Sequence, residues 1–481
     1  MKLKQFLFSA ALLASMNAIG QSVPTHEMYV DFGITERTDI VSALDKWQPG
    51  DNFSNDPDYQ DENFFISRVP LKSRFINQNT QANKNLNEEN NKNLCWCSPI
   101  GEMTKKWGPM PRYNFDGDNF NMWQYINIHA NWSNTWFRVP GTFNDVAHKN
   151  GVRTGCLYFI DWAEQVSATS SAGKMLAELC AKDGSGNFKY ARKLIQFLKY
   201  YGIDGLGLNP EGYWSTQLNE DFSSFLAECH KVAKEMNHPF HVEWYAFVSN
   251  TGGLNDNGCK LEIGANDKWF HKNGNPVTDV FFLNYNWSES GLQTSAEAAK
   301  SLGRSTYDVY AGFDQQGRGY GKYGNAGWTA LMRQPVSIVV WGAHDRSQLY
   351  AGSTEGGNSD LSVQNEYQKK QELLFTGGSR NVLRTPDITD DAITSSYSDL
   401  AKWHGYSKAV IEESALTELP FVTRFNLGNG LSFSKDGVVT FEHKWYNLGL
   451  QDLLPTWRWW IDNGDGTTIP ADPINCDFTF D

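Results

Sequence analysis

The sequence predicts an α/β fold of the TIM (β/α)8 type, followed by a β-rich, sandwich-like part. Apolar runs typical of buried strands alternate with amphipathic helical segments between residues 122 and 343, which is the pattern of parallel β/α units. Several of these runs end in polar or aromatic residues, which a barrel would bring together at one mouth. A doubly wound open sheet is the competing fold. The sequence disfavours it because no glycine-rich phosphate turn follows the first run.

The elements of the barrel are expected in a regular order. The clearest helix, 187–202, carries apolar residues at i, i+3 and i+7 on one face and stops at Gly202, as an amphipathic helix does. The strand that carries Asn209 and Glu211 follows at once. The other expected strands are 122–132, 152–162, 240–248, 279–287, 307–314 and 336–343, and the other expected helices are 143–151, 221–239 and 295–304.

Composition divides the chain into parts. Residues 21–375 are assigned to the catalytic barrel, with a polar, Asn-rich and solvated insertion near 77–94. The Gly-rich segment 317–327 lacks the lysine and helix of a phosphate loop and is read as a loop over the mouth. Residues 376–481 show the alternation and the Asn-Gly and Asp-Gly turns of β-hairpins. This last part is expected to be a linker and the start of a β-rich domain, and its end would fit a fragment of a longer protein.

Charge and aromatic content narrow the class of partner. The 481 residues carry a formal net charge of -13, and 14% are aromatic, including 18 Trp. An acidic chain without basic runs argues against a nucleic-acid partner, because a phosphate backbone requires clustered Lys and Arg. Exposed Trp and Tyr rings suit the faces and hydroxyl rims of sugars, although most of these rings are expected in the core.

The N-terminal residues 1–20 read as a signal peptide. Lys2 and Lys4 precede an apolar run at 6–14, and small residues near Gly20 form a cleavage site. The run is too short to cross a bilayer, and no other stretch approaches the length of a membrane span. The sequence therefore predicts a secreted or periplasmic protein.

The seven cysteines show no disulfide framework. Their number is odd, and most are expected to be buried free thiols. Cys95 and Cys97 could form a bridge, bind a metal or do neither. No matching Cys or His cluster lies nearby, so a metal site is not expected.

Asn209 and Glu211 are the candidate catalytic pair. Side chains two positions apart on a strand point to the same face, and Pro210 with Gly212 suggests that both lie near the end of the strand. A carboxyl in an apolar cleft can hold a proton near neutral pH, so Glu211 suits a general acid. Asn209 cannot ionise and is therefore neither nucleophile nor base in a two-carboxylate glycosidase.

An amide beside the acid suits a substrate that supplies its own nucleophile. The acetamide oxygen of a 2-acetamido sugar can attack its own anomeric carbon, and Asn209 could hold the acetamide N-H. Alternatively, Asn209 caps a loop and Glu211 is a satisfied carboxylate at a strand end. This stretch by itself does not decide between the two readings.

Six ordered motifs resemble glycoside hydrolase family 85, the endo-β-N-acetylglucosaminidases. They are "YGIDGLGLNPEGYW", "EWYAFVSNTG", "FFLNYNW", "SAEAAKSLGRSTYDVYAGFDQQGRG", "LPFVTRFNLGNG" and "LQDLLPTWRWW". The resemblance implies substrate-assisted, retaining cleavage of the GlcNAc-β-1,4-GlcNAc bond in the chitobiose core of N-linked glycans or glycoproteins, through an oxazoline and without a cofactor. It also implies that the released glycan can be transferred to an acceptor hydroxyl.

The resemblance also implies roles for single residues. Glu211 would be the general acid and then base, Asn209 would orient the acetamide, and Tyr245 would hydrogen-bond at the reacting centre. The expected substrate contacts are Trp162, Trp244, Asn284, Trp287, Asp314 and Trp341. The chain departs from the family in "WYAF", where an Asp usually follows the Trp-Tyr pair, and in "LCWCSPIGEMTKKWGP", where a Gly-rich segment is usual. These departures leave the preferred glycan open.

Two other readings remain open. A non-catalytic, lectin-like barrel would be expected to lack the acid, and Glu211 is present. A chitinase-like hydrolase of family 18 would carry Asp at the position of Asn209. The sequence does not indicate the oligomeric state.

Overall fold

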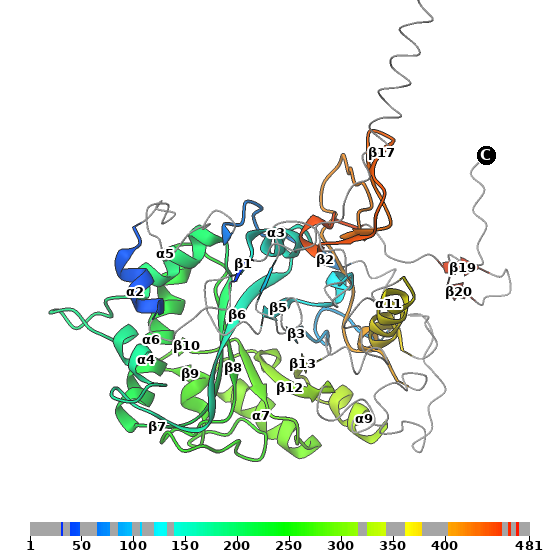
Figure 1. Cartoon of the computed structure of the whole chain (residues 1–481). Helices are drawn as coiled ribbons and strands as arrows, with labels where there is room; N and C mark the ends of the chain where they lie inside the picture. The colour runs from blue at the N-terminus through cyan, green and yellow to red at the C-terminus, as the bar shows by residue number, and fades with distance from the viewer. Residues whose placement is uncertain are drawn as a thin grey trace, which may run out of the picture.

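The computed structural model describes residues 30–31, 39–48, 65–76, 85–98, 106–107, 120–131, 139–315, 325–342, 361–377, 403–454, 460–462 and 468–470. Its centre is a closed barrel of parallel strands in the order β11-β12-β13-β3-β5-β6-β7-β8 (Figure 1). The strands are β3 (Leu94–Ser98), β5 (Ile128–Asn131), β6 (Arg153–Val166), β7 (Gly205–Trp214), β8 (His241–Tyr245), β11 (Val280–Leu283), β12 (Val309–Asp314) and β13 (Ser337–Trp341). The predicted TIM-type barrel is therefore confirmed.

Helices alternate with the strands and cover the outside of the barrel (Figure 1). They are α2 (Asp39–Lys46), α3 (Gly141–Lys149), α4 (Lys174–Leu179), α5 (Ala191–Tyr201), α6 (Thr216–Glu235), α7 (Glu289–Ser301), α9 (Asn325–Arg333) and α11 (Leu361–Thr376). Helix α5 ends at Gly202, whose φ of 71° is the left-handed conformation that glycine adopts without strain. Helix α6 begins after Ser215, whose hydroxyl accepts a hydrogen bond from the Leu218 backbone N-H.

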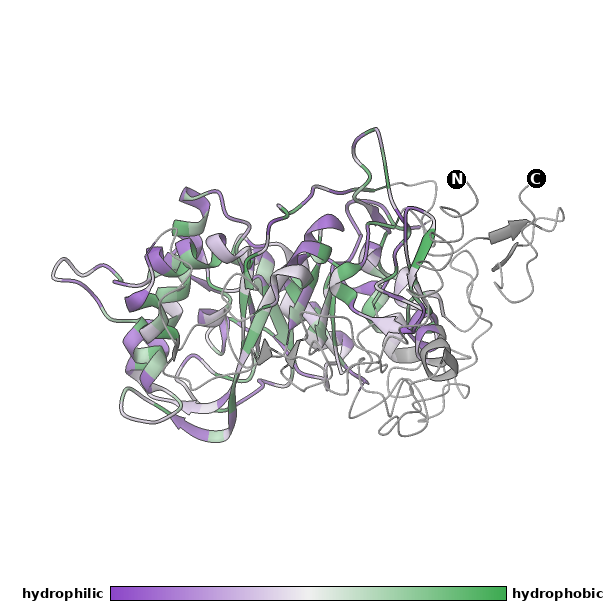
Figure 2. Ribbon diagram, turned by 45° about the horizontal axis from the view of Figure 1, so that its top comes forward, coloured by the Kyte–Doolittle hydropathy of each residue, from purple (hydrophilic) through white to green (hydrophobic). Residues whose placement is uncertain are grey.

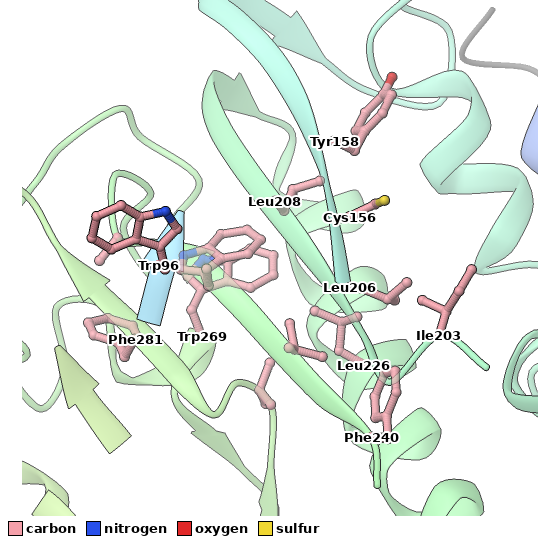
Figure 3. Close-up of a cluster of buried hydrophobic side chains, with 14 of the residues drawn as sticks. Trp96, Cys156, Tyr158, Ile203, Leu206, Leu208, Leu226, Phe240, Trp269 and Phe281 are labelled. Carbon is pink, nitrogen blue, oxygen red and sulfur yellow. The ribbon is translucent and has the colours of Figure 1, made fainter. Parts of the chain in front are cut away.

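Two apolar layers hold the barrel together. The larger layer lies between the strands and the helices; Figure 3 shows part of it, with Trp96, Cys156, Tyr158, Leu206 and Leu208 among the labelled side chains. Hydropathy follows the same division, with apolar stretches on the central strands and polar stretches on the outer helices (Figure 2). The smaller layer fills the inside of the barrel and consists of Cys95, Cys97, Ile128, Ala130, Leu157, Tyr245, Val280, Phe282, Tyr310 and Val339.

The first barrel strand was not predicted. It is β3, "LCWCS", which follows the polar insertion directly and is too short for its alternation to stand out. Cys95 and Cys97 point into the barrel while Trp96 packs outside, because successive side chains of a strand face opposite ways. Both thiols are free and buried, as are Cys156, Cys180, Cys229 and Cys259.

Strand β7 is longer than predicted. Sequence reasoning ended it near Pro210 and Gly212, but it continues to Trp214. The continuation pairs with β6 alone, because the pairing of β7 with β8 ends at Leu208 opposite Trp244. A proline that lacks an N-H is tolerated on such a half-paired strand.

β-rich elements follow the barrel in sequence. The hairpin of β16 (Phe433–Lys435) and β17 (Val438–Phe441) turns at Asp436 and Gly437, whose φ angles are 52° and 78°. These are the positive values that an Asp-Gly hairpin turn requires. Two further short pairs in this part are β15 (Asn429–Gly430) with β18 (Trp445–Tyr446) and β19 (Trp460–Asp462) with β20 (Thr468–Pro470). Strand β14 (Glu413–Ser414) pairs with β2 (Phe75–Ile76), which precedes the barrel in sequence.

Residues after the barrel also contribute to its outer core. Trp403 and Tyr406 are buried in the same cluster as the barrel helices, and Trp403 donates its indole N-H to the Leu374 carbonyl at 2.8 Å. The proposed division at residue 375 stays a prediction. The expected signal peptide, residues 1–20, lies outside the described residues. Within the part of the chain that the structure describes, no helix combines the length and apolarity needed to cross a bilayer.

Candidate active site

Strand β7 brings Asn209 and Glu211 to one face at the mouth of the barrel. Asn209 donates its side-chain N-H to Glu211 Oε2 at 2.9 Å, which confirms that the two side chains point the same way. Asn209 is 8% exposed, whereas Glu211 is half-buried. The pair lies just past the last pairing of β7 with β8, at the carboxyl ends of the strands, where enzymes of this fold keep their chemistry.

The environment of Glu211 favours its protonated form. Burial raises the pKa of this carboxyl, the hydrogen bond from Asn209 lowers it, and the nearby charge of Asp161 raises it again. The net effect is a pKa above the ordinary value of a glutamic acid. A carboxyl in this state can donate a proton at a pH where an ordinary surface glutamate is ionised.

Tyr245 lies on the inner face of β8, beside the pair. Its ring is 8% exposed and packs edge-on against Phe282, with ring centroids 5.0 Å apart. Burial raises the pKa of its hydroxyl, and the charge of Glu211 adds to this effect. The hydroxyl is therefore neutral and can donate a hydrogen bond.

Three further predicted residues lie at the mouth. Asp314 ends β12 close enough to raise the pKa of Tyr245, and Trp341 ends β13 and packs against the inner cluster. Trp162 is 62% exposed, and its ring packs edge-on against Phe247 with centroids 5.3 Å apart.

Asn284 and Trp287 have structural partners instead. The amide of Asn284 donates to Asp256 Oδ2 at 3.1 Å and accepts from the Tyr285 backbone N-H at 2.6 Å. The indole N-H of Trp287 donates to the Gly312 carbonyl at 2.9 Å, and the ring packs against the outer core. Contacts of either residue with a substrate stay a prediction.

The structure does not bring Trp244 to the mouth. Its side chain is fully buried among the helices and stacks on Trp269, with ring centroids 3.9 Å apart. Neighbouring residues of a strand face opposite ways, so when Tyr245 points into the barrel Trp244 must point out of it. The expectation that Trp244 contacts a substrate is corrected to a role in packing.

Sequence reasoning missed Tyr213 and Glu243. Tyr213 is 45% exposed and lies two residues beyond Glu211 on β7; the alternation of the strand could have indicated it, had the strand been extended past Gly212. Glu243 is 1% exposed and lies on the inner face of β8, two residues before Tyr245. Burial raises the pKa of its carboxyl to about 7.

No metal centre is evident in the described part of the chain. Those residues contain no group of three or more His, Cys, Asp or Glu side chains that could hold a metal ion. The mouth instead combines a carboxyl whose pKa is raised, a primary amide and a neutral phenol. Such a set can donate a proton and hold a polar group, but its amide cannot serve as a nucleophile.

Comparisons with known proteins point to one family of glycoside hydrolases. A model of glycosyl hydrolase family 85 matches residues 104–433. The chain is 23% identical over 467 residues to cytosolic endo-beta-N-acetylglucosaminidase from Gallus gallus, which covers 93% of this chain and 53% of that protein. It is 24% identical over 357 residues to cytosolic endo-beta-N-acetylglucosaminidase 2 from Arabidopsis thaliana, covering 73% of this chain and 42% of that protein.

A solved structure shows the same fold. The glycoside hydrolase domain of Endo-D from Streptococcus pneumoniae R6 superimposes with a TM-score of 0.70 at 24% identity, over 88% of this chain and 61% of that chain. The chain spans about half the length of the curated relatives described above, 42% and 53% of them.

The comparisons correct the expected location. The six matched curated proteins are all named cytosolic, so the expectation of a secreted or periplasmic protein is wrong. Two lysines before a short apolar run are a compositional signal, and composition by itself does not fix the compartment of a protein.

Proposed function

The chain belongs to glycosyl hydrolase family 85, and we propose that it is an endo-β-N-acetylglucosaminidase that cleaves the GlcNAc-β-1,4-GlcNAc bond in the chitobiose core of N-linked glycans. The observation that carries this proposal is the hydrogen-bonded pair of Asn209 and Glu211 at the barrel mouth. The names of the matched relatives support the bond, and the chemistry of the pair supports the mechanism.

In the first step Glu211 donates its proton to the oxygen between the two sugars. The acetamide oxygen of the sugar on the non-reducing side attacks the anomeric carbon, the bond to the leaving sugar breaks, and a protonated oxazoline (an oxazolinium ion) that keeps the acetamide N-H forms. Asn209 has one amide N-H on Glu211, and its Oδ1 is available to accept the acetamide N-H. Holding that N-H turns the acetamide oxygen toward the anomeric carbon and stabilises its developing charge.

In the second step a water molecule attacks the oxazoline, and ionised Glu211 accepts the proton from that water. Two inversions at the anomeric carbon give retention. Tyr245 contributes a neutral hydroxyl beside the reacting centre, where it can donate a hydrogen bond to the acetamide or to the sugar ring. Asp314, Trp341 and Trp162 would contact the sugars around them.

An amide in place of a second carboxylate argues for this mechanism over the two-carboxylate scheme. A carboxylate nucleophile at Asn209 would form a covalent glycosyl-enzyme, which an amide cannot do. The substrate must then bring the nucleophile, and a 2-acetamido sugar carries one.

Mass spectrometry of N-glycoproteins tests the proposal. Incubation should leave a single GlcNAc on the modified asparagine and release the rest of the glycan, and a panel of high-mannose and complex glycoproteins would identify the preferred glycan. Glu211→Gln should abolish cleavage while glycan binding persists, because only the proton-transferring group is lost. Glu178→Gln is the matched control and should cleave normally, because this side chain lies on helix α4 and is 41% exposed. Binding of glycans without any mass change in the unaltered protein would instead favour the lectin-like reading.

A further inference from the structure

Strands β6 and β7 continue past the barrel rim as a two-stranded ribbon (Figure 1). The pairing of β7 with β8 ends at Leu208, but its pairing with β6 extends to Trp214 opposite Val166. The tip of the ribbon is anchored: Trp214 is 4% exposed, and its backbone N-H donates to the Gly252 carbonyl at 2.8 Å. The ribbon therefore holds its side chains in fixed positions above the mouth.

Tyr213 lies on the mouth face of this ribbon. Alternation along β7 places Asn209, Glu211 and Tyr213 on one side of the strand. At the usual rise of a strand, Tyr213 lies about 7 Å beyond Glu211, roughly the length of one sugar unit. Its ring is 45% exposed and packs on no other aromatic ring of the described residues.

A β-bulge in the neighbouring strand presents a second ring. The register between β6 and β7 shifts between Ile160 and Glu164, and Ala163 within the shift has a φ of 62°, which a residue with a Cβ rarely adopts. The bulge carries Trp162, which is 62% exposed and rests on Phe247. Bulges at barrel rims commonly re-aim a side chain beside an active site.

The depth of each residue indicates which sugar these rings would meet. Asn209, the deepest of the three, holds the sugar whose acetamide reacts, and Glu211 acts at the oxygen between the sugars. The leaving sugar must lie on the other side of that oxygen, which is the side of Tyr213. We propose that Tyr213 and Trp162 form the subsite for the leaving GlcNAc, the sugar that stays attached to the protein. This inference rests on the proposed function.

The same subsite would receive the acceptor in glycan transfer. The acceptor hydroxyl of a GlcNAc takes the place of water, its oxygen bonds to the anomeric carbon as the oxazoline C-O bond breaks, and its proton passes to Glu211. Aromatic rings suit this ligand, because the C-H face of a pyranose packs on a flat apolar ring. The subsite therefore decides both the binding of the glycopeptide and the share of transfer over hydrolysis.

Kinetics with two kinds of substrate test the subsite. Tyr213→Ala should raise the KM for a GlcNAc-terminated acceptor about fivefold, or about 1 kcal/mol, while hydrolysis of a preformed oxazoline stays within about twofold, because an oxazoline has no leaving sugar. Tyr213→Phe keeps the ring and should retain the acceptor KM. Phe433→Ala removes an aromatic side chain of similar exposure, 43%, from β16 and is the matched control.

The outcomes separate the two proposals. If the unaltered protein cleaves glycopeptides and Tyr213→Ala behaves like Phe433→Ala, the subsite is refuted and the proposed function stands. Equal losses of Tyr213→Ala on the acceptor and on the oxazoline would also refute the subsite, because they would indicate a structural role. If the unaltered protein cleaves no glycopeptide and uses no oxazoline, the proposed function fails and the subsite falls with it. Trp162→Ala should repeat the pattern of Tyr213→Ala.

Discussion

Replacing Asn209 by alanine should separate the two steps of the reaction. The side chain makes one hydrogen bond within the described structure, from its N-H to Glu211 Oε2 at 2.9 Å, and it offers Oδ1 to the substrate. The variant loses one preorganised acceptor for the acetamide N-H. Loss of a single such group at a developing charge costs about 100-fold to 1,000-fold in kcat. Cleavage of a natural glycan should fall by that factor.

A preformed sugar oxazoline bypasses the step that Asn209 assists. Asn209→Ala should therefore hydrolyse or transfer the oxazoline at a rate near that of the unaltered protein, because Glu211 remains in place to accept the proton. The assay compares kcat on a glycopeptide with kcat on the oxazoline, and Glu211→Gln serves as the reference that lacks the proton-transferring group.

The pH profile gives a second, independent readout. Burial raises the pKa of Glu211, and the hydrogen bond from Asn209 partly offsets this effect by lowering it. Removing the hydrogen bond should therefore raise the pKa of Glu211 further. Since Glu211 must be protonated for the first step, the basic limb of the residual activity should move to higher pH. Equal losses on glycan and oxazoline, or a basic limb that moves to lower pH, would refute the assigned role of Asn209.

Two further predictions concern carboxyl groups near the site. Asp161→Asn removes a charge that raises the pKa of Glu211, so the basic limb of glycan cleavage should move to lower pH; an unchanged limb would contradict this. Glu243→Gln should raise the free energy of unfolding, and this gain should be larger at higher pH. The folded pKa of Glu243, about 7, lies above its ordinary value, so the native state loses stability as pH rises from about 4.5 to about 7. Unfolding free energies of the two proteins should diverge by about 3 kcal/mol over that window, and parallel curves would show that Glu243 does not titrate there.

The sequence predicted what depends on long, regular patterns. Helices α5 and α6 have clear apolar faces, and α5 stops at Gly202 as expected, so their existence needed no tertiary information. Helix α6 was expected to begin at residue 221, but it begins at Thr216. The pairing of Asn209 with Glu211 followed from the two-residue period of a strand. These features are local, and they survive in the fold because the tertiary packing agrees with them.

What the sequence did not predict depends on partners distant in the chain. The five residues of strand β3 are all buried, and the strand pairs with β13 on one side and with β5 on the other. "LCWCS" is a barrel strand because of these two neighbours, which its own short sequence does not reveal. The outward direction of Trp244 required the register of β8, which the pattern "FHVEWYAFV" leaves open because both faces carry aromatic side chains. The continuation of β7 past Pro210 required knowledge that β6 is equally long.

The continuation of β7 past Pro210 determines how exposed each residue of the site is. Because one strand leaves the barrel while paired on a single side, its alternate residues pass from the buried rim to solvent: Asn209 is 8% exposed, Glu211 is half-buried and Tyr213 is 45% exposed. A strand that ended at Pro210 would place the acid at an unsupported edge, where water would keep it ionised. The ribbon instead keeps Glu211 covered enough to hold a proton and leaves room beyond it for a second sugar. The same extension therefore supports the proposed acid and the proposed leaving-sugar subsite, and shortening it should impair both together.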